Sequence, residues 1–253
     1  VSGQTVSPSG YWTHVALTVD SQAGTATLYV NGAATSGSVA PGFACNGLAT
    51  RVAGFPSGSY TGGLKGYYFA GAMDDWRVYT GLMSPESLAK VVGVSAFGGG
   101  SGSQPDPFIV ASPKHLHNVR NLPNAVYQQS ANIDLGSSPW VGWSPIGETG
   151  HAFGGTFLGA GKVISGLQMT VYSAGYSWGL FGVVDHAQII GVSLYLSGLF
   201  VNGPAYAGTS GALAGTVTNS SITDCQATGG YIDFQGTAGG LVGSLTDSSL
   251  ARS

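Results

Sequence analysis

A glycine-bounded phrase occurs three times in the second half of the chain. The copies are Gly179-Leu180-Phe181-Gly182, Gly211-Ala212-Leu213-Ala214-Gly215 and Gly239-Gly240-Leu241-Val242-Gly243, with final glycines 33 and 28 residues apart. An aliphatic residue follows each final glycine after seven residues: Ile189, Ile222 and Leu250. A constant register at such a period is typical of proteins in which each repeat stacks on the next. The phrase therefore predicts a solenoid with a continuous apolar core.

Each repeat continues with a short alternating stretch and then a turn that contains Asp or Asn. Asp185, Asn219 and Asp247 are predicted to hold equivalent turn positions, because these side chains hydrogen-bond local backbone and tolerate a left-handed conformation. Glycines allow tight corners and close backbone approach. The expected geometry is a right-handed parallel β-helix, and the acidic residues of the repeats are assigned to turns.

The first part of the chain shows the two-residue alternation of β-strands. Val15, Leu17 and Val19 fall on one parity, which predicts a half-buried strand with these residues inward. Residues 21–24 supply a turn, and residues 25–31 resume the alternation. A β-hairpin is therefore expected.

A third strand is expected over residues 67–79, followed by a helix. Ser84 is predicted as the N-cap, Pro85 suits the first helical position and Glu86 adds an acid to the first turn. The helix is expected to run to about Val92 and to be closed by Gly93.

Four motifs in order give the first unit a resemblance to a known family. They are Trp12-Thr13-His14-Val15-Ala16, Leu28-Tyr29-Val30-Asn31-Gly32, the stretch 69–79 and the stretch 82–88. Together they resemble the C-terminal half of a laminin-G-type, concanavalin A-like jelly roll. Such sandwiches need about twice this length, so the resemblance implies that the missing front strands lie upstream or come from another chain.

Residues 97–107 pass from glycine and serine to proline, which predicts a flexible linker that stiffens before the next unit. The predicted domains are thus 1–96, a partial sandwich; 97–107, the linker; and 108–253, the solenoid. The expected fold class is all-β, a partial concanavalin A-like jelly-roll sandwich followed by a right-handed parallel β-helix.

The second unit resembles the GLUG-motif proteins of bacterial surfaces and secretions, which are named for phrases like Gly239-Gly240-Leu241-Val242-Gly243. The resemblance implies a short first helix over residues 113–120 and a first strand over residues 131–135. Residues 158–161 depart from the family, where a polar Asp-Gly-Asn-Gly turn is usual. The last phrase lies close to Ser253, so further repeats or another molecule are expected to cover the final coil.

Composition and charge exclude several classes of partner. The chain has 8 Lys and Arg, 11 Asp and Glu and a net charge of -3, so it lacks the basic surface that nucleic acid requires. No apolar run is long enough to span a membrane as a helix, and no membrane insertion is expected. Any export signal is expected outside residues 1–253. Cys45 and Cys225 are interpreted as unpaired buried residues rather than a disulfide.

Four residues of the first unit are the candidate site. Tyr60, Tyr67 and Tyr68 could stack on a sugar ring, and core or rim packing is the alternative. Asp74 shares strand parity with apolar residues; it is either a calcium ligand or an acceptor of backbone N–H groups in a loop. Calcium is the single cofactor considered.

No catalytic constellation can be assembled from the sequence. His115 and His117 point in different directions on the expected helix, and no Cys or acid is spaced to complete a metal site with them. His151 and His186 have no nucleophile nearby in the sequence pattern. The chain is therefore not expected to be an enzyme.

The resulting hypothesis is a non-catalytic segment of a large bacterial adhesin or binding protein, located extracellularly or at the cell surface. The sandwich would recognise a glycan or a surface protein, and the β-helix would be its stalk. One alternative is a filament or sheath subunit that self-associates by strand complementation with neighbouring chains. Another is an accessory region of a secreted hydrolase or protease.

Overall fold

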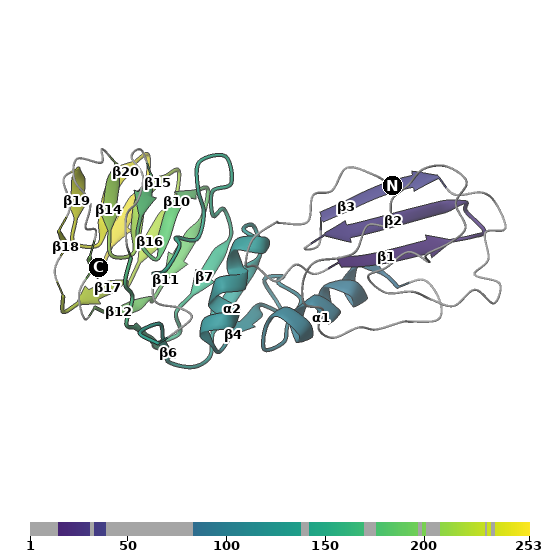
Figure 1. Cartoon of the computed structure of the whole chain (residues 1–253), viewed down its shortest axis with the longest axis horizontal. Helices are drawn as coiled ribbons and strands as arrows, with labels where there is room; N and C mark the ends of the chain where they lie inside the picture. Colours follow the sequence, from purple (N-terminus) through teal and green to yellow (C-terminus); the bar gives the residue numbers. More distant parts are fainter. Residues whose placement is uncertain are drawn as a thin grey trace, which may run out of the picture.

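A computed structural model shows an all-β chain with an antiparallel sheet at one end and a parallel β-solenoid at the other (Figure 1). Two helices lie between them. The structure describes these residues: 15–30, 33–38, 83–137, 142–169, 176–196, 199–200, 208–230, 232–233 and 236–253.

The antiparallel sheet contains the expected hairpin. Strands β1 (Val15–Asp20), β2 (Thr25–Val30) and β3 (Ala33–Ser38) lie in that order. The Asp20 carboxylate closes the first turn by accepting the N–H groups of Gln22 at 3.0 Å and Ala23 at 2.8 Å.

The predicted apolar face of the hairpin is buried on one strand only. Val15, Leu17 and Val19 pair with residues of β2, so the two sets share one face. On β2 the face contains the buried Ala26 and Val30, which confirms the expectation there. On β1 the three side chains are 50%, 61% and 38% exposed, so the prediction that they are buried is wrong. The alternate residues of the strand, Ala16 and Thr18, are the more buried ones, so the alternation is present and its buried side is the opposite one.

Helix α1 (Pro85–Ala96) begins as expected and ends later. The Ser84 side chain accepts the N–H of Ser87 at 3.2 Å, which confirms the N-cap. The predicted end at Val92 is wrong, because Gly93 is a buried interior residue. A Cβ at Gly93 would overlap the carbonyl oxygen of Gly100. This glycine is therefore needed for close backbone approach and does not terminate the helix.

The segment 97–107, predicted as a flexible linker, is packed against the solenoid. Phe97 is buried and stacks on Phe108 with a centroid distance of 4.5 Å. Gly98 donates to the carbonyl of Ile109 at 2.8 Å, and Ile109 donates back to Gly99 at 3.0 Å. These bonds hold the glycines in a defined path, so the interpretation of this segment as flexible is corrected. The division into domains otherwise stays a prediction.

A second helix covers the N-terminal end of the solenoid core. Helix α2 (Pro113–Asn118) and the 3-10 turn η1 (Val119–Asn121) bury Leu116 and Val119 completely, which agrees with the short helix expected here. The Asn118 side-chain amide donates to the carbonyl of Ala96 at 2.8 Å. The end of α1 and the start of the solenoid are thereby joined.

The solenoid strands pair only in parallel, coil on coil. Their bounds are β4 (Phe108–Val110), β5 (Val126–Gln129), β6 (Ile133–Asp134), β7 (Thr156–Leu158), β8 (Val163–Ser165), β9 (Ser177–Trp178), β10 (Phe181–Asp185), β11 (Gln188–Ile190), β12 (Ser193–Tyr195), β13 (Leu199–Phe200), β14 (Thr209–Gly211), β15 (Ala214–Thr218), β16 (Ser221–Thr223), β17 (Gln226–Thr228), β18 (Ile232–Asp233), β19 (Thr237–Gly239), β20 (Val242–Thr246) and β21 (Ser249–Ala251).

The strand register confirms the period that the sequence predicts. Ile189 lies beside Ile222, and Ile222 beside Leu250, so the three aliphatic residues form one core column. The steps of 33 and 28 residues differ at a single corner. Eight residues join β13 to β14, whereas three join the equivalent strands β18 and β19.

Aromatic side chains fill the core near its N-terminal end. Tyr127, Phe153, Phe157 and Phe181 are fully buried, and the rings of Phe153 and Phe181 lie 4.9 Å apart. In the strands stacked beyond Phe181, the same position is alanine and then valine. The aromatic side chain of this column is thus replaced by small aliphatic ones in the later coils.

The approach of Gly93 to Gly100 gives a test of the junction. Gly93→Ala should lower the free energy of unfolding by about 2 kcal/mol or more, because the added methyl group displaces backbone rather than a flexible side chain. The control is Lys90→Ala at an exposed position of the same helix, with an expected change within about 0.5 kcal/mol. Urea denaturation followed by circular dichroism measures both. Equal stability of the two variants would contradict the close approach.

Candidate functional site

The residues that the sequence nominates for binding fall outside the described part of the chain. Tyr60, Tyr67, Tyr68 and Asp74 all lie within residues 39–82. Their roles therefore stay predictions. The polar residues described below belong to the described part of the solenoid.

The first solenoid corner shows what the acidic turn residues do. The equivalent left-handed positions are His186, Asn219 and Asp247, with φ of 56°, 48° and 48°. Asp185 lies one residue earlier, beside Thr218 in the next coil, so its predicted equivalence to Asp247 is wrong by one position. The sequence misled here because an Asp next to a turn resembles an Asp in the turn.

Asp185 links two coils through its carboxylate. It accepts from the Asn219 amide and the Thr218 hydroxyl, both at 3.0 Å, and lies 3.0 Å from His186 Nδ1. The Asn219 hydrogen bond, followed by those of His186 and Thr218, lowers the pKa of Asp185. Because Thr218 and Asn219 belong to the next coil, the Asp185 carboxylate holds the two coils together.

The second corner is held by an exposed ion pair. Asp224 and Arg252 occupy left-handed positions of successive coils, with φ of 55° and 51°. The Arg252 guanidinium donates to both Asp224 oxygens at 2.6 and 2.8 Å. This hydrogen-bonded pair lowers the pKa of Asp224 and raises that of Arg252. The Asp224 carboxylate is thus also bound by a residue of the next coil.

The two histidines of α2 contact the backbone and neighbouring side chains. His115 Nδ1 accepts the N–H of Ala111 at 3.2 Å. The His117 ring meets Trp143 edge-on at 6.1 Å, and the Arg120 guanidinium lies 5.1 Å from the same indole. Burial, followed by the positive charge of Arg120, lowers the pKa of His117 to about 4. Among the residues that the structure describes, no group of three His, Cys, Asp or Glu side chains could hold a metal ion.

Cys225 is a buried thiol between two coils. Its sulfur accepts the N–H of Val192 at 3.4 Å, and burial raises its pKa. Burial and a raised pKa both favour the unreactive thiol form. Cys45, the other cysteine, lies outside the described residues, so their predicted lack of pairing stays a prediction.

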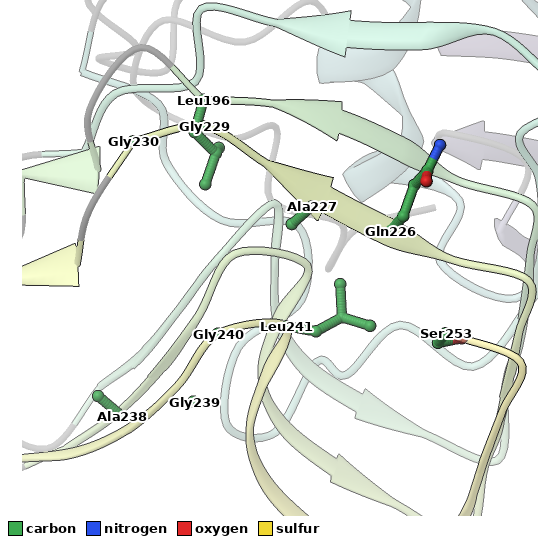
Figure 2. Close-up of a pocket in the computed structure, with 10 residues that line it drawn as sticks. All are labelled: Leu196, Gln226, Ala227, Gly229, Gly230, Ala238, Gly239, Gly240, Leu241 and Ser253. Atoms are coloured by element: carbon green, nitrogen blue, oxygen red, sulfur yellow. The ribbon is translucent and has the colours of Figure 1, made fainter.

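A hollow of about 550 Å³ lies at the C-terminal end of the solenoid (Figure 2). Its lining residues come from the last two coils and, at Leu196, from the coil before them: Leu196, Gln226, Ala227, Gly229, Gly230, Ala238, Gly239, Gly240, Leu241 and Ser253. Most of these residues are small or apolar. The arrangement can accommodate an apolar group but offers little chemistry for a reaction.

The hollow arises because small residues replace larger ones in the core columns. Ala227 stacks on Leu194, and the next column position has Gly229 where the preceding coil has Leu196. A Cβ atom at Gly240 would meet no atom within 4 Å. This hollow was not predicted from the sequence. Aligning residues 193–196 with 226–229 would have found the loss of two leucines.

The described part of the chain contains no helix long and apolar enough to cross a membrane. This finding concerns helices alone.

Comparison with known families supports the concanavalin A-like fold of the first unit. A family model for the concanavalin A-like lectin/glucanases superfamily matches residues 1–89. The combination of a concanavalin A-like domain and a β-solenoid confirms the predicted fold class. Two finer assignments stay predictions. They are the resemblance of residues 108–253 to GLUG-motif proteins and the placement of residues 1–96 in the C-terminal half of a sandwich.

A curated protein of Evansella cellulosilytica, called "Putative Gly-rich membrane protein", is 30% identical over 126 residues. The match covers 48% of this chain and 14% of that protein. This chain therefore corresponds to a small part of its relative.

A solved structure from Bacteroides ovatus, described as "a putative immunoglobulin A1 protease", is 17% identical. The match covers 60% of this chain and 66% of that one, with a TM-score of 0.32. A similarity of this size supports no conclusion about fold or activity.

The depressed pKa of His117 predicts a loss of stability in acid. Between pH 6.5 and about 4 the unfolded imidazole binds a proton that the folded one does not, so stability falls as the pH falls. His117→Gln should flatten the curve of melting temperature against pH in this window. His115, whose pKa is also lowered by burial and then by Lys114, leaves a residual slope. Parallel curves for the two chains would contradict the assignment.

Proposed function

We propose that this chain is a non-catalytic recognition segment of a bacterial protein that acts outside the cell or at its surface. The concanavalin A-like unit binds a glycan or a surface protein, and the solenoid is the stalk on which it is mounted. The match of residues 1–89 to a lectin-containing superfamily supports the recognition role.

The junction between the two units is the observation that carries the proposal. Helix α1 begins within the family match and ends against the solenoid, where Phe97 stacks on Phe108. The bond from Asn118 to Ala96 and the contact of Gly93 with Gly100 add to this attachment. These contacts fix helix α1, whose first residues lie in the family match, to the solenoid, and such an attachment suits the presentation of a binding unit on a stalk.

The surface chemistry of the solenoid also suits a stalk. Hydroxyl groups bond to one another along its coils: Ser177, Thr209 and Thr216 form a cluster with distances of 2.7 to 3.1 Å. Ser249 likewise donates to Ser221 of the preceding coil at 3.2 Å. Such ladders satisfy polar groups between coils without placing charge on the surface.

A non-catalytic role is supported by how the described carboxylates are used. Asp134 accepts the N–H of Gly136, while Asp185 and Asp224 are tied to neighbouring coils. General acid–base chemistry needs carboxylates that converge on one substrate. Asp134 instead stabilises its own turn, and Asp185 and Asp224 link successive coils.

Two other functions remain as alternatives. An accessory region of a secreted hydrolase is favoured by one observation, the presence of glucanases in the matched superfamily. A filament built by stacking solenoids end to end receives less support, because α2 and Phe97 already cover the N-terminal end.

Glycan binding by the three tyrosines can be tested on the whole chain. Tyr60, Tyr67 and Tyr68 changed together to Ala should weaken binding to a glycan array at least about tenfold, equivalent to ~1.4 kcal/mol. The control changes Tyr176 and Tyr195 to Ala; these solenoid tyrosines are 51% and 56% exposed. Equal losses in both variants, or a lower melting temperature in the triple variant alone, would assign the three rings to packing or to a nonspecific effect.

Calcium binding through Asp74 is tested by thermal unfolding. A hundredfold excess of calcium over its Kd should stabilise the chain by about 2.7 kcal/mol, and Asp74→Asn should abolish the effect. The control is Asp75→Asn, the adjacent acid, which should leave the stabilisation intact. No rise in melting temperature with calcium, or equal behaviour of both variants, would refute the site.

A further inference from the structure

A short helical segment covers the N-terminal end of the solenoid core. Helix α2 and the turn η1, here called the cap, contain six and three residues. Their contacts with the core are made through Leu116 and Val119, which are completely buried. A helix this short is not stable by itself in water. The cap therefore keeps its conformation only while these contacts last, and two histidines lie beside them.

His115 binds the backbone in a way that depends on its protonation state. Its Nδ1 accepts the N–H of Ala111, the residue after β4, at 3.2 Å. Because an N–H group can only donate, the neutral ring carries its proton on Nε2. Protonation in acid adds a hydrogen to Nδ1, and two donors then face each other. The bond that ties α2 to the end of β4 is lost in that state.

His117 lies beside a positive charge that is fixed in place. The Arg120 guanidinium donates to the carbonyl oxygens of His117 at 2.8 Å, Ser144 at 2.9 Å and Pro145 at 3.4 Å. It also lies 5.1 Å from the Trp143 ring, which the His117 ring meets edge-on. A protonated His117 cannot move away from this charge while α2 stays in position.

The charged side chains that act on the two rings are both positive. For His115 burial is the larger cause of the lowered pKa and Lys114 the second. For His117 burial again comes first and Arg120 second, and the pKa is about 4. Burial and a neighbouring positive charge both disfavour the imidazolium. Release of the cap removes both effects, so acid favours the released state.

The other elements packed against the cap supply no charge that offsets this. The last turn of α1, residues 93–96, and the segment 142–146 contain no charged side chain. Asp106, in the segment after α1, is not a cause of either shift. Tyr127 of β5 is buried, which raises its pKa well above 10, so it stays neutral in acid.

We propose that the cap is an acid-sensitive joint: when His115 and His117 are protonated, α2 and η1 leave the end of the solenoid. The bond from Asn118 to Ala96, which holds the end of α1, is lost with them. The coils from β7 onward stay stacked, because the pKa of Asp185 lies below its ordinary value and its inter-coil bonds persist. This inference does not rest on the recognition role, since it concerns the solenoid and its cap alone.

Hydrogen exchange of the whole chain, followed by mass spectrometry, tests the joint. Peptides over residues 113–121 should lose protection at least about tenfold between about pH 7 and about pH 4.5, after correction for intrinsic exchange rates. A single histidine shifted from 6.5 to about 4 allows roughly a hundredfold change, and partial exposure of the ring reduces it. Peptides over β15 and β16 should keep their protection.

Two variants with a control assign the effect to the histidines. In the double variant His115→Asn, His117→Phe, the Asn oxygen can accept from Ala111 and the Phe ring keeps the edge contact with Trp143, so protection should not change with pH. His117→Lys carries a permanent charge and should release the cap at neutral pH. The control is His151→Lys, at an exposed position of the solenoid, which should behave as the unmodified chain does.

Several outcomes would overturn the proposal. One is a loss of protection in the cap and the coils at the same pH, since acid would then act on the whole fold. Unchanged protection of the cap in acid is another, and an acid response that persists in the double variant is a third. Should the double variant lack a protected cap at neutral pH, equal protection in His117→Lys and His151→Lys would decide against the joint.

Discussion

The structure depends on coils that stack in register. Parallel strands place Ile189, Ile222 and Leu250 in one column, and each coil supplies both the hydrogen-bonding partners and the core contacts of the next. A single coil could bury little on its own. Every other feature, from the corner turns to the covering helix, either preserves this register or closes an end of the stack.

This dependence explains what the sequence could reveal. The period, the phrase glycines and the helix start at Ser84 are local signals, and the structure confirms them. The end of α1 was mispredicted because Gly93 faces Gly100, a contact that local sequence does not show. The segment after α1 has the composition of a linker, yet Phe97 fixes it by stacking on Phe108.

The candidate site shows a similar limit. A turn with Asp or Asn is readable from sequence, but strand register decides which residue is left-handed, and that residue is His186 rather than Asp185. The hollow depends on comparing equivalent positions of two coils, where Gly229 replaces Leu196. The 33-residue step between the phrase glycines gives the same alignment as the strand pairing, so the change could have been found by comparing the residues between the phrases.

The unequal lengths of the two repeats have an evolutionary consequence. The connection between β13 and β14 is five residues longer than the connection between β18 and β19. Strand β13 nevertheless pairs with β18, and β14 pairs with β19. One corner can thus gain or lose residues without shifting a core column. Mutation can change the length of this connection while the scaffold is conserved, so that related solenoids would differ most in the residues between β13 and β14.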